Sequence, residues 1–276
     1  MTWTINRVLL RLRSPMHIGW NKVGNVQRTR SYVTGRVLWG ALTERVTRDE
    51  AKDKGPATDS RLYAEVGKTI NGQLAFSYFY PTTDPDGEVR LWPWHDDFRR
   101  LHLSTYASTA LAYPEQSADE GTLHEVECLV PQTMNGGDQV YLSGYVLALD
   151  DAPPWESALW RLQLGGERGY GWGRVEPVTE PSAGRDLFGY KLDLNADRPI
   201  VHIPENGVLL AHTLAAGLEP AGVSGRIEPL VGRVTNREGH FGGRLTSAQI
   251  CLTPGTRTLR PITLQIGAYG IWEAVS

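Results

Sequence analysis

The sequence lacks several features that would place it in a simple class. It holds two cysteines in 276 residues, Cys128 and Cys251, whose separation excludes the paired spacing of a zinc site. No run of about eighteen apolar residues occurs, and arginines stand where a signal peptide would have its apolar centre. We therefore expect buried thiols, a cytoplasmic protein without a membrane segment, and neither metal nor cofactor.

Two long segments each carry charges of almost a single sign, the first basic and the second acidic. Residues 1–48 hold nine basic residues and the single acid Glu44, whereas residues 101–160 hold nine acids and no lysine or arginine. A protein that needed only solubility would mix its signs, so this separation predicts a polyanion at the first segment and a basic partner at the second. Glu115, Asp119 and Glu120 are the acids that we expect to face this partner.

Glycine, in contrast, is concentrated in one stretch between Gly165 and Gly173, which holds five glycines in nine residues. Such a stretch loses much chain entropy on folding, so plain connection is a poor reason for it. Its backbone N–H groups, two arginines and two aromatic rings suit the phosphates and bases of RNA. The alternative is a glycine-rich turn whose aromatic side chains lie in the core.

The hydrophobic pattern predicts a series of elements. In residues 5–13, Val8, Leu10 and Leu12 alternate with arginines, which predicts a strand with one charged face. We expect a loop over 14–33, a helix over 37–46, a hairpin of strands 73–80 and 88–92, strands 123–131 and 139–149 joined by a turn, a helix after Pro153 and a strand over 172–178. Residues 49–69 give no clear pattern.

This order is that of a ferredoxin-like βαββαβ unit. Together with PMHIGW at 15–20 and RSYVTGRVLWGALTERV at 30–46, it resembles the RAMP superfamily of CRISPR-associated proteins, which carry a glycine-rich loop after their second helix. The resemblance covers about residues 1–178. It implies an α+β fold, with a ferredoxin-like, RNA-recognition-like domain over residues 1–180 and a smaller β-rich domain over 181–276.

Within this superfamily the chain is most similar to the Cas-five type subunit, which caps the five-prime handle of the guide RNA (crRNA) in a multi-subunit, type III effector complex. The expected partners are crRNA and neighbouring effector subunits. The expected RNA-binding residues are His17, Lys22, Arg28, Arg30, Arg36, Gly165, Gly166, Arg168, Tyr170, Trp172 and Arg174. This reading makes the chain a structural subunit and not an enzyme.

Three other roles compete with capping. The backbone subunits that cut target RNA typically place an aspartate after the first strand, but residues 1–43 hold no acid, which disfavours that role. A metal-independent crRNA-processing endoribonuclease needs a general base, and His17 with Tyr32 can fill that role. A carbohydrate-binding β-rich module would use exposed Trp92, Trp94 and Trp172, although an arginine-rich strand gives such a module no advantage.

Overall fold

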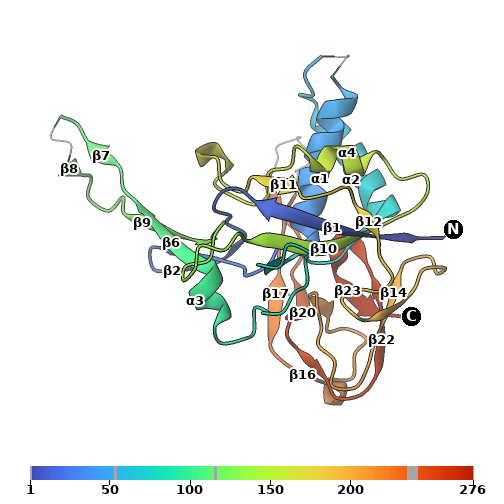
Figure 1. The fold of residues 1–276 in the computed structure, drawn as a ribbon. Coiled ribbons are helices and arrows are strands. Elements are labelled where there is room, and N and C mark those ends of the chain that lie inside the picture. The colour runs from blue at the N-terminus through green and yellow to red at the C-terminus, as the bar shows by residue number, and fades with distance from the viewer. Residues whose placement is uncertain (1, 53–54, 115–116, 235–241, 276) are drawn as a thin grey trace.

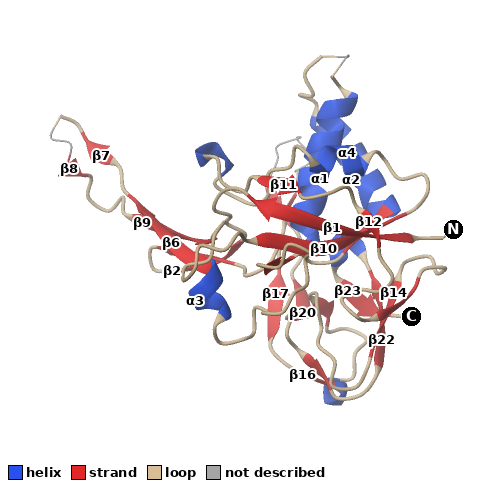
Figure 2. Cartoon of the chain, viewed as in Figure 1, coloured by secondary structure: helices blue, strands red, loops and turns tan. Residues whose placement is uncertain are grey.

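The computed structural model describes residues 2–52, 55–114, 117–234 and 242–275. Its first part contains β1 (Thr4–Leu12), β2 (Gly19–Val23), β3 (Val26–Thr29), α1 (Gly35–Glu50), α2 (Ser60–Gln73), β4 (Leu74–Phe76), β5 (Tyr80–Thr82), α3 (Phe98–His102), β6 (Leu103–Ser108), β7 (Leu111–Ala112), β8 (Ser117–Ala118), β9 (His124–Leu129), β10 (Tyr141–Ala148), α4 (Trp155–Leu159), the short 3-10 helix η1 (Arg168–Tyr170), β11 (Val175–Pro177) and β12 (Ser182–Ala183). Its second part contains β13 (Lys191–Asp193), β14 (Ile200–Ile203), β15 (Thr213–Leu214), η2 (Pro220–Gly222), β16 (Val223–Ser224), β17 (Ile227–Leu230), β18 (Arg233–Val234), β19 (Arg244–Leu245), β20 (Gln249–Leu252), β21 (Arg257–Thr258), β22 (Ile262–Ile266), η3 (Ala268–Gly270) and β23 (Trp272–Ala274). The chain thus combines several sheets with few helices (Figure 2), as expected for the fold class at that level of detail.

The central sheet has the strand order β11-β1-β10-β4, with β12 also beside β1 and β5 also beside β10. All of these neighbours are antiparallel. Figure 1 shows α1, α2 and α4 on one side of this sheet and the second, strand-rich part of the chain on the other side. The sheet is therefore covered on both faces.

Each face of the sheet has its own hydrophobic core. Leu10 and Leu12 of β1 pack with Leu38 and Leu42 of α1 in the first core, as the alternation of β1 and the apolar stripe of α1 predicted. The second core joins Trp3, at the start of the chain, to Ile266 and Trp272, near its end. The proposed ranges 1–180 and 181–276 thus share this second core.

The loop expected over residues 14–33 contains an antiparallel hairpin of β2 and β3. Gly24, with φ of +59°, and Asn25 form its two-residue turn, a position that favours glycine. All five residues of β2 are exposed, so no apolar alternation marked this strand in the sequence.

The hairpin expected from strands 73–80 and 88–92 is wrong. Residues 88–92 form no strand, and β4 and β5 both pair with β10 instead. Between them, Ser77 exchanges two hydrogen bonds with Tyr145, from its backbone N and to its side-chain oxygen. At Ser77 the alternation of side chains between the two faces of the sheet is interrupted. Phe76 therefore belongs to the first core and Tyr78 to the second, whereas a continuous strand would have put both on one face.

The two strands expected over 123–131 and 139–149 exist and are joined by the expected turn, where Gln132 bridges to Gln139, but each strand then enters a different sheet. β9 pairs with β3 and β6, while β10 lies in the central sheet. We call residues 103–129 the arm, because β6 and β9 run side by side away from the body and β7 and β8 form its tip (Figure 1). Residues 115–116 of the arm lie outside the described ranges. Glu115, one of the acids expected to face a partner, is among them.

Candidate nucleic-acid interface

The glycine-rich loop is joined to the segment that follows β1. Gly166 N donates to the His17 carbonyl oxygen at 2.8 Å, and Gly173 N donates to the Pro15 carbonyl oxygen at 2.7 Å. A third bond runs from Arg174 N to the Ser14 hydroxyl at 2.9 Å. Two stretches far apart in the sequence, 160 positions in the case of Ser14 and Arg174, thus form one surface.

Close packing explains two of the glycines in this loop. Gly165 has φ of +81° and a Cβ there would stand 2.3 Å from the His17 carbonyl oxygen. Gly173 has φ of +77°, and its Cβ would stand 1.8 Å from the Leu164 carbonyl oxygen. No other residue fits either position without moving backbone. Gly169, in contrast, faces open space.

The tip of the loop presents side chains to solvent. The Tyr170 side chain is 80% exposed, and Arg174 is also exposed, with no ion pair to the described part of the chain. Trp172 is half-buried and packs edge-on against Tyr106 of the arm, with ring centroids 5.9 Å apart. Arg168 forms an ion pair with Glu44 of α1, so its charge is partly engaged.

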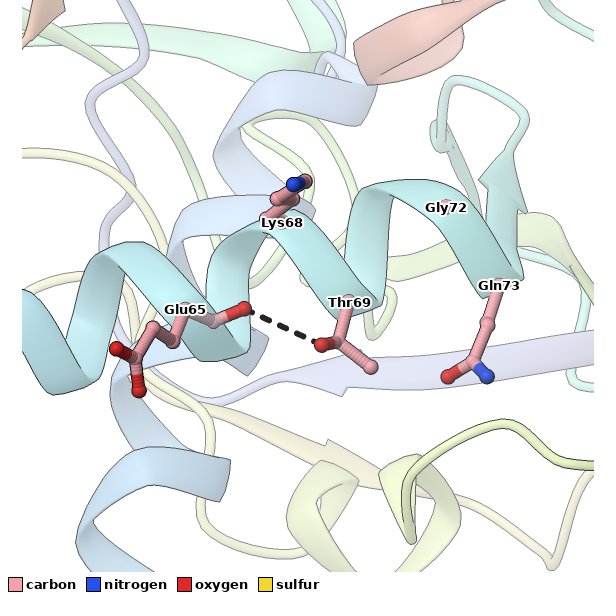
Figure 3. Close-up of a pocket in the computed structure, with 5 residues that line it drawn as sticks. All are labelled: Glu65, Lys68, Thr69, Gly72 and Gln73. Carbon is pink, nitrogen blue, oxygen red and sulfur yellow. Dashed lines mark hydrogen bonds between the residues drawn. The ribbon is translucent and has the colours of Figure 1, made fainter.

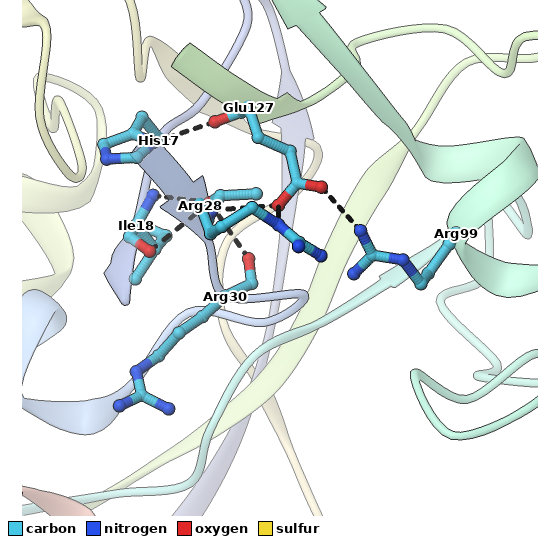
Figure 4. A network of polar contacts seen from close by, with 7 residues as sticks. His17, Ile18, Arg28, Arg30, Arg99 and Glu127 are labelled. Atoms are coloured by element: carbon cyan, nitrogen blue, oxygen red, sulfur yellow. Dashed lines mark hydrogen bonds and ion pairs between the residues drawn. The ribbon is translucent and has the colours of Figure 1, made fainter. Parts of the chain in front are cut away.

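His17 is buried beneath this surface, beside a carboxylate network (Figure 4). Its Nδ1 lies 2.8 Å from the backbone oxygen of Glu127. Since a carbonyl oxygen only accepts, Nδ1 carries the proton, and the Nε2 of the neutral ring is left as an acceptor. The structure therefore fixes the tautomer that a general base at Nε2 requires.

The Glu127 side chain is 8% exposed and ties three elements together. One of its oxygens accepts from Thr29 N at 3.0 Å and from Arg28 Nε at 3.1 Å. The other accepts from the guanidinium of Arg99, in α3, at 2.6 Å. Arg28 is thus held by an internal carboxylate, at the base of the arm.

Arg30 belongs to a second network, at the contact with the strand-rich part. Its Nη2 lies 2.7 Å from Glu228 Oε1, which also accepts from His212 Nε2 at 2.7 Å. The His212 Nε2 carries the proton that it donates to Glu228. The Nδ1 of the ring therefore accepts from the Tyr78 hydroxyl at 2.7 Å. Trp20 of β2 donates to the other Glu228 oxygen at 3.2 Å.

The pKa values in this second network follow from burial and pairing. Burial acts to raise the pKa of Glu228, but the hydrogen bond from His212 and the charge of Arg30 outweigh it and lower the pKa to about 2. Burial lowers the pKa of His212. Tyr32 stacks on Tyr78 with centroids 5.5 Å apart, and burial raises its pKa to about 12.

The remaining expected site residues lie in different settings. Arg36 donates to the Arg233 carbonyl oxygen at 3.1 Å and lies over the Tyr269 ring at 4.8 Å. Lys22 is exposed on β2. Of the expected RNA-binding side chains, the structure therefore leaves Lys22, Tyr170 and Arg174 exposed, and engages Arg28, Arg30, Arg36 and Arg168 in internal contacts.

The two residues of the nuclease alternative lie in different environments. His17 contacts the glycine-rich loop and Glu127, whereas Tyr32 lies in the aromatic cluster of Tyr78, Tyr80 and His212. The structure brings His17, but not Tyr32, to the glycine-rich loop. Trp92 and Trp94 of the carbohydrate alternative stack on each other at 5.1 Å and pack against the second core.

Several residues that shape this region could not be identified from the sequence. Glu127, Arg99, Glu228 and His212 pair across at least 16 positions of the chain, and no local pattern announces such contacts. Only the acid-free character of residues 1–43 hinted that the arginines there need partners from elsewhere.

A surface depression elsewhere offers no comparable chemistry. It runs along α2 and is lined by Glu65, Lys68, Thr69, Gly72 and Gln73 (Figure 3). All five belong to one helix, and the Thr69 hydroxyl is already bonded to the Glu65 carbonyl oxygen at 3.2 Å. Among the described residues there is no cluster of three metal-ligating side chains, and no helix is long and apolar enough to cross a membrane.

The fold is similar to that of chains from solved type III-B Cmr-beta complexes. One solved chain comes from the type III-B Cmr-beta complex bound to cognate target RNA and AMPPnP; it matches with a TM-score of 0.53 and 11% identity, over 91% of this chain and 85% of that one. A second, from the same kind of complex bound to cognate target RNA, matches with a TM-score of 0.51 and 9% identity, over 91% and 86%. No protein-family model and no curated protein sequence matches this chain.

Proposed function

We propose that this chain is a guide-RNA-binding structural subunit of a CRISPR effector complex, which caps the five-prime handle of the crRNA and contacts neighbouring backbone subunits. The observation that carries the proposal is the joining of the glycine-rich loop to residues 14–17 by three hydrogen bonds. The likeness to chains of the Cmr-beta complex supports the same assignment at the level of the fold.

The proposal includes a ferredoxin-like RAMP domain over residues 1–180. The antiparallel order β11-β1-β10-β4 supports it, with α1 following β1 and α4 following β10 in the chain. Such a unit brings its first and last strands together, and β1 pairs with β11 from Leu10↔Pro177 to Leu12↔Val175. That pairing places the loop before β11 next to the segment after β1.

The exposed groups of the loop suit single-stranded RNA. Tyr170 can stack on a base, which is sequence-tolerant and worth about 1–3 kcal/mol per base. Arg174 can bind a phosphate in a bidentate manner. Lys22, on the exposed strand β2, adds a further cation.

The second candidate function is the metal-independent processing endoribonuclease. The fixed tautomer of His17 favours it, because Nε2 is free to take a proton from a 2′-hydroxyl. Against it, cleavage also needs a second group for the leaving oxygen, and the His17 side chain is only 6% exposed. We therefore propose binding without cleavage.

A binding and cleavage assay tests both candidates. Labelled repeat RNA incubated with the protein should be retained on filters, with an affinity that falls steeply with salt, and should stay intact with or without magnesium. A discrete product that disappears in His17→Ala would establish the nuclease instead. Sequencing of the RNA that co-purifies with the protein adds the finer point: a shared, repeat-derived five-prime end supports capping, and random cellular RNA contradicts it.

A further inference from the structure

Trp20 is a large aromatic residue outside the set that the sequence predicted to bind RNA. It is the extra residue of a β-bulge in the β2–β3 hairpin: Gly19 pairs with Thr29 and Asn21 with Arg28, so Trp20 has no partner across the ladder. Bulges redirect a side chain and are common beside functional sites. Trp20 is 45% exposed, and among the described residues no other aromatic ring and no guanidinium lies over its ring.

The strand-rich part of the chain holds this ring in place through Glu228. The Trp20 indole N–H donates to Glu228 Oε2 at 3.2 Å. The other oxygen, Oε1, binds Arg30 and His212, each at 2.7 Å, and the side chains of these two donors are 13% and 0% exposed. A carboxylate bound by two buried donors has a fixed orientation, so its third bond orients the half-exposed ring. An ordered ring loses less conformational freedom when a ligand binds to it.

Trp20 also lies close to the glycine-rich loop. The His17 ring stands between the two segments: a Cβ on Gly166 of the loop would stand 3.4 Å from its Cδ2, and a Cβ on Gly19 would stand 3.7 Å from its Nε2. Gly19 directly precedes Trp20 in the chain. The bulged residue therefore extends the surface formed by the loop and residues 14–17 toward the strand-rich part.

From this geometry we infer that Trp20 is a base-stacking residue of the RNA-binding surface, and that Glu228 of the strand-rich part positions it. The inference rests on the proposed function, because that supplies the RNA. Stacking on an aromatic ring suits any base, since every base has a π-face. Glu228 thus acts on bound RNA only through the ring that it orients.

The charges around Trp20 favour RNA over a protein as the occupant. The charge of Glu228 is compensated by Arg30 at 2.7 Å, so this acid does not repel phosphates as a lone carboxylate would. Lys22, two positions further along β2, is exposed and can bind a phosphate. Protein interfaces, in contrast, are depleted of lysine.

Fluorine NMR of the full-length protein labelled with 5-fluorotryptophan tests the stacking. The resonance that disappears in Trp20→Phe belongs to Trp20. Single-stranded repeat RNA should shift this resonance, because a stacked base changes the magnetic environment of the ring. Inorganic polyphosphate, which has charges but no bases, should leave it in place. Trp160 is 46% exposed and is the matched control, whose resonance should move with neither ligand.

Two results of this experiment would overturn the inference. The first is a Trp20 resonance that stays unmoved while the protein binds the RNA. The second is a resonance that responds only when the other subunits are added, which would assign Trp20 to a protein contact.

Affinity gives the quantitative readout. Trp20→Ala should weaken the binding of repeat RNA at least about fivefold in filter retention, because one stacking platform is lost. Trp160→Ala should leave the affinity unchanged. Equal melting temperatures of the two variants would show that the loss does not come from unfolding. An affinity of Trp20→Ala equal to that of the wild-type protein would contradict the stacking role.

A double-mutant cycle separates positioning by Glu228 from a purely structural role. Glu228→Gln keeps one oxygen for the buried donors, but the acceptor of the Trp20 indole N–H is lost. This change should weaken RNA binding about twofold or more in the wild-type background and have no further effect in Trp20→Phe, where there is no indole N–H to orient. An equal loss in both backgrounds would overturn the positioning role.

The outcomes also separate the inference from the function on which it rests. A wild-type protein that retains no repeat RNA overturns both. A protein that binds the RNA, but with the same affinity in Trp20→Ala and with an unmoved Trp20 resonance, overturns the stacking role alone.

Discussion

The β2–β3 hairpin and the glycine-rich loop both carry residues expected to bind RNA, and they use their cations in opposite ways. Arg28 and Arg30, in and just after β3, are held by the buried carboxylates of Glu127 and Glu228. In the loop, Arg174 and Tyr170 are exposed. The two arginines of the hairpin are therefore paired inside the molecule while Lys22 on β2 stays exposed, and the loop pairs Arg168 with Glu44 but presents Arg174 to solvent.

This difference shows why a count of charges along the sequence overstates the basic surface. Residues 1–48 hold a large excess of basic residues, but several of these are compensated by acids from distant segments. Glu127 comes from the acidic segment and Glu228 from the strand-rich part. The opposite charges that the sequence separates are brought together in part by the fold.

The largest effect is expected where the hairpin is held to the strand-rich part. Glu228→Ala leaves Arg30 and His212 without their acceptor in a site where the Arg30 side chain is only 13% exposed. Removing one partner of a buried ion pair costs about 3–5 kcal/mol, so the free energy of unfolding in urea should fall by about that amount. Asp119→Ala, an exposed acid on the arm, should leave this energy unchanged, and an equally small change in both variants would contradict the role of the network.

Acid should weaken the same contact in two steps. The pKa of His212 lies below its usual range when folded, so the unfolded state takes up a proton first and stability falls as the pH drops below about 6.5. The pKa of Glu228 is about 2 when folded, so its contribution, complete above about pH 4.5, is lost as the pH falls toward 2. Urea unfolding over a pH series measures both steps, and Glu228→Ala should remove the second one; a series with the same slope in the variant would contradict the assignment.

The loop should behave in the reverse manner. Tyr170→Ala with Arg174→Gln removes exposed groups, so thermal stability should stay the same while RNA affinity at low salt drops about tenfold. Arg28→Gln is the comparison, since it disturbs Glu127 and should lower stability more than RNA affinity. Equal losses of RNA affinity in the two proteins would remove the distinction between hairpin and loop.

The smallest effect is expected at Glu44, the acid that pairs with Arg168. Both side chains are partly exposed, and such pairs contribute less than about 1 kcal/mol to stability. Glu44→Gln frees the guanidinium of Arg168 within the loop, so RNA affinity should rise by about twofold without a change in melting temperature. A fall in affinity would mean that Glu44 positions Arg168 for binding.

Sequence patterns predicted the parts of the fold that repeat regularly. β1 alternates Val8, Leu10 and Leu12 with arginines, and α1 carries its apolar stripe at helical spacing. In both elements the pattern therefore predicts which face is buried. β2 is exposed throughout and gave no such signal. The change of side at Ser77 depends on a hydrogen bond to Tyr145, which no local pattern contains.

The candidate site was predictable only in part for the same reason. The glycine cluster and its aromatic residues identified the loop, whereas its place beside the segment after β1 comes from the pairing of β1 with β11. Whether an arginine is paired or exposed could not be predicted, because the pairing depends on carboxylates far away in the chain. These lie 99 positions from Arg28 and 198 positions from Arg30. Distinguishing a solvent-facing cation from a paired one requires the three-dimensional contacts.

The second core has a consequence for the order of events during synthesis. Trp3, just before the first strand, packs in one cluster with Trp272, and the start of α1 lies against the same part of the chain, where a Cβ on Gly35 would stand 2.4 Å from the Tyr269 carbonyl oxygen. Domains usually fold as they emerge, beginning with the N-terminal one. Here one face of the central sheet stays uncovered until residue 272 has left the ribosome, so the first strand is fully buried only after the strands that follow residue 200 have been made.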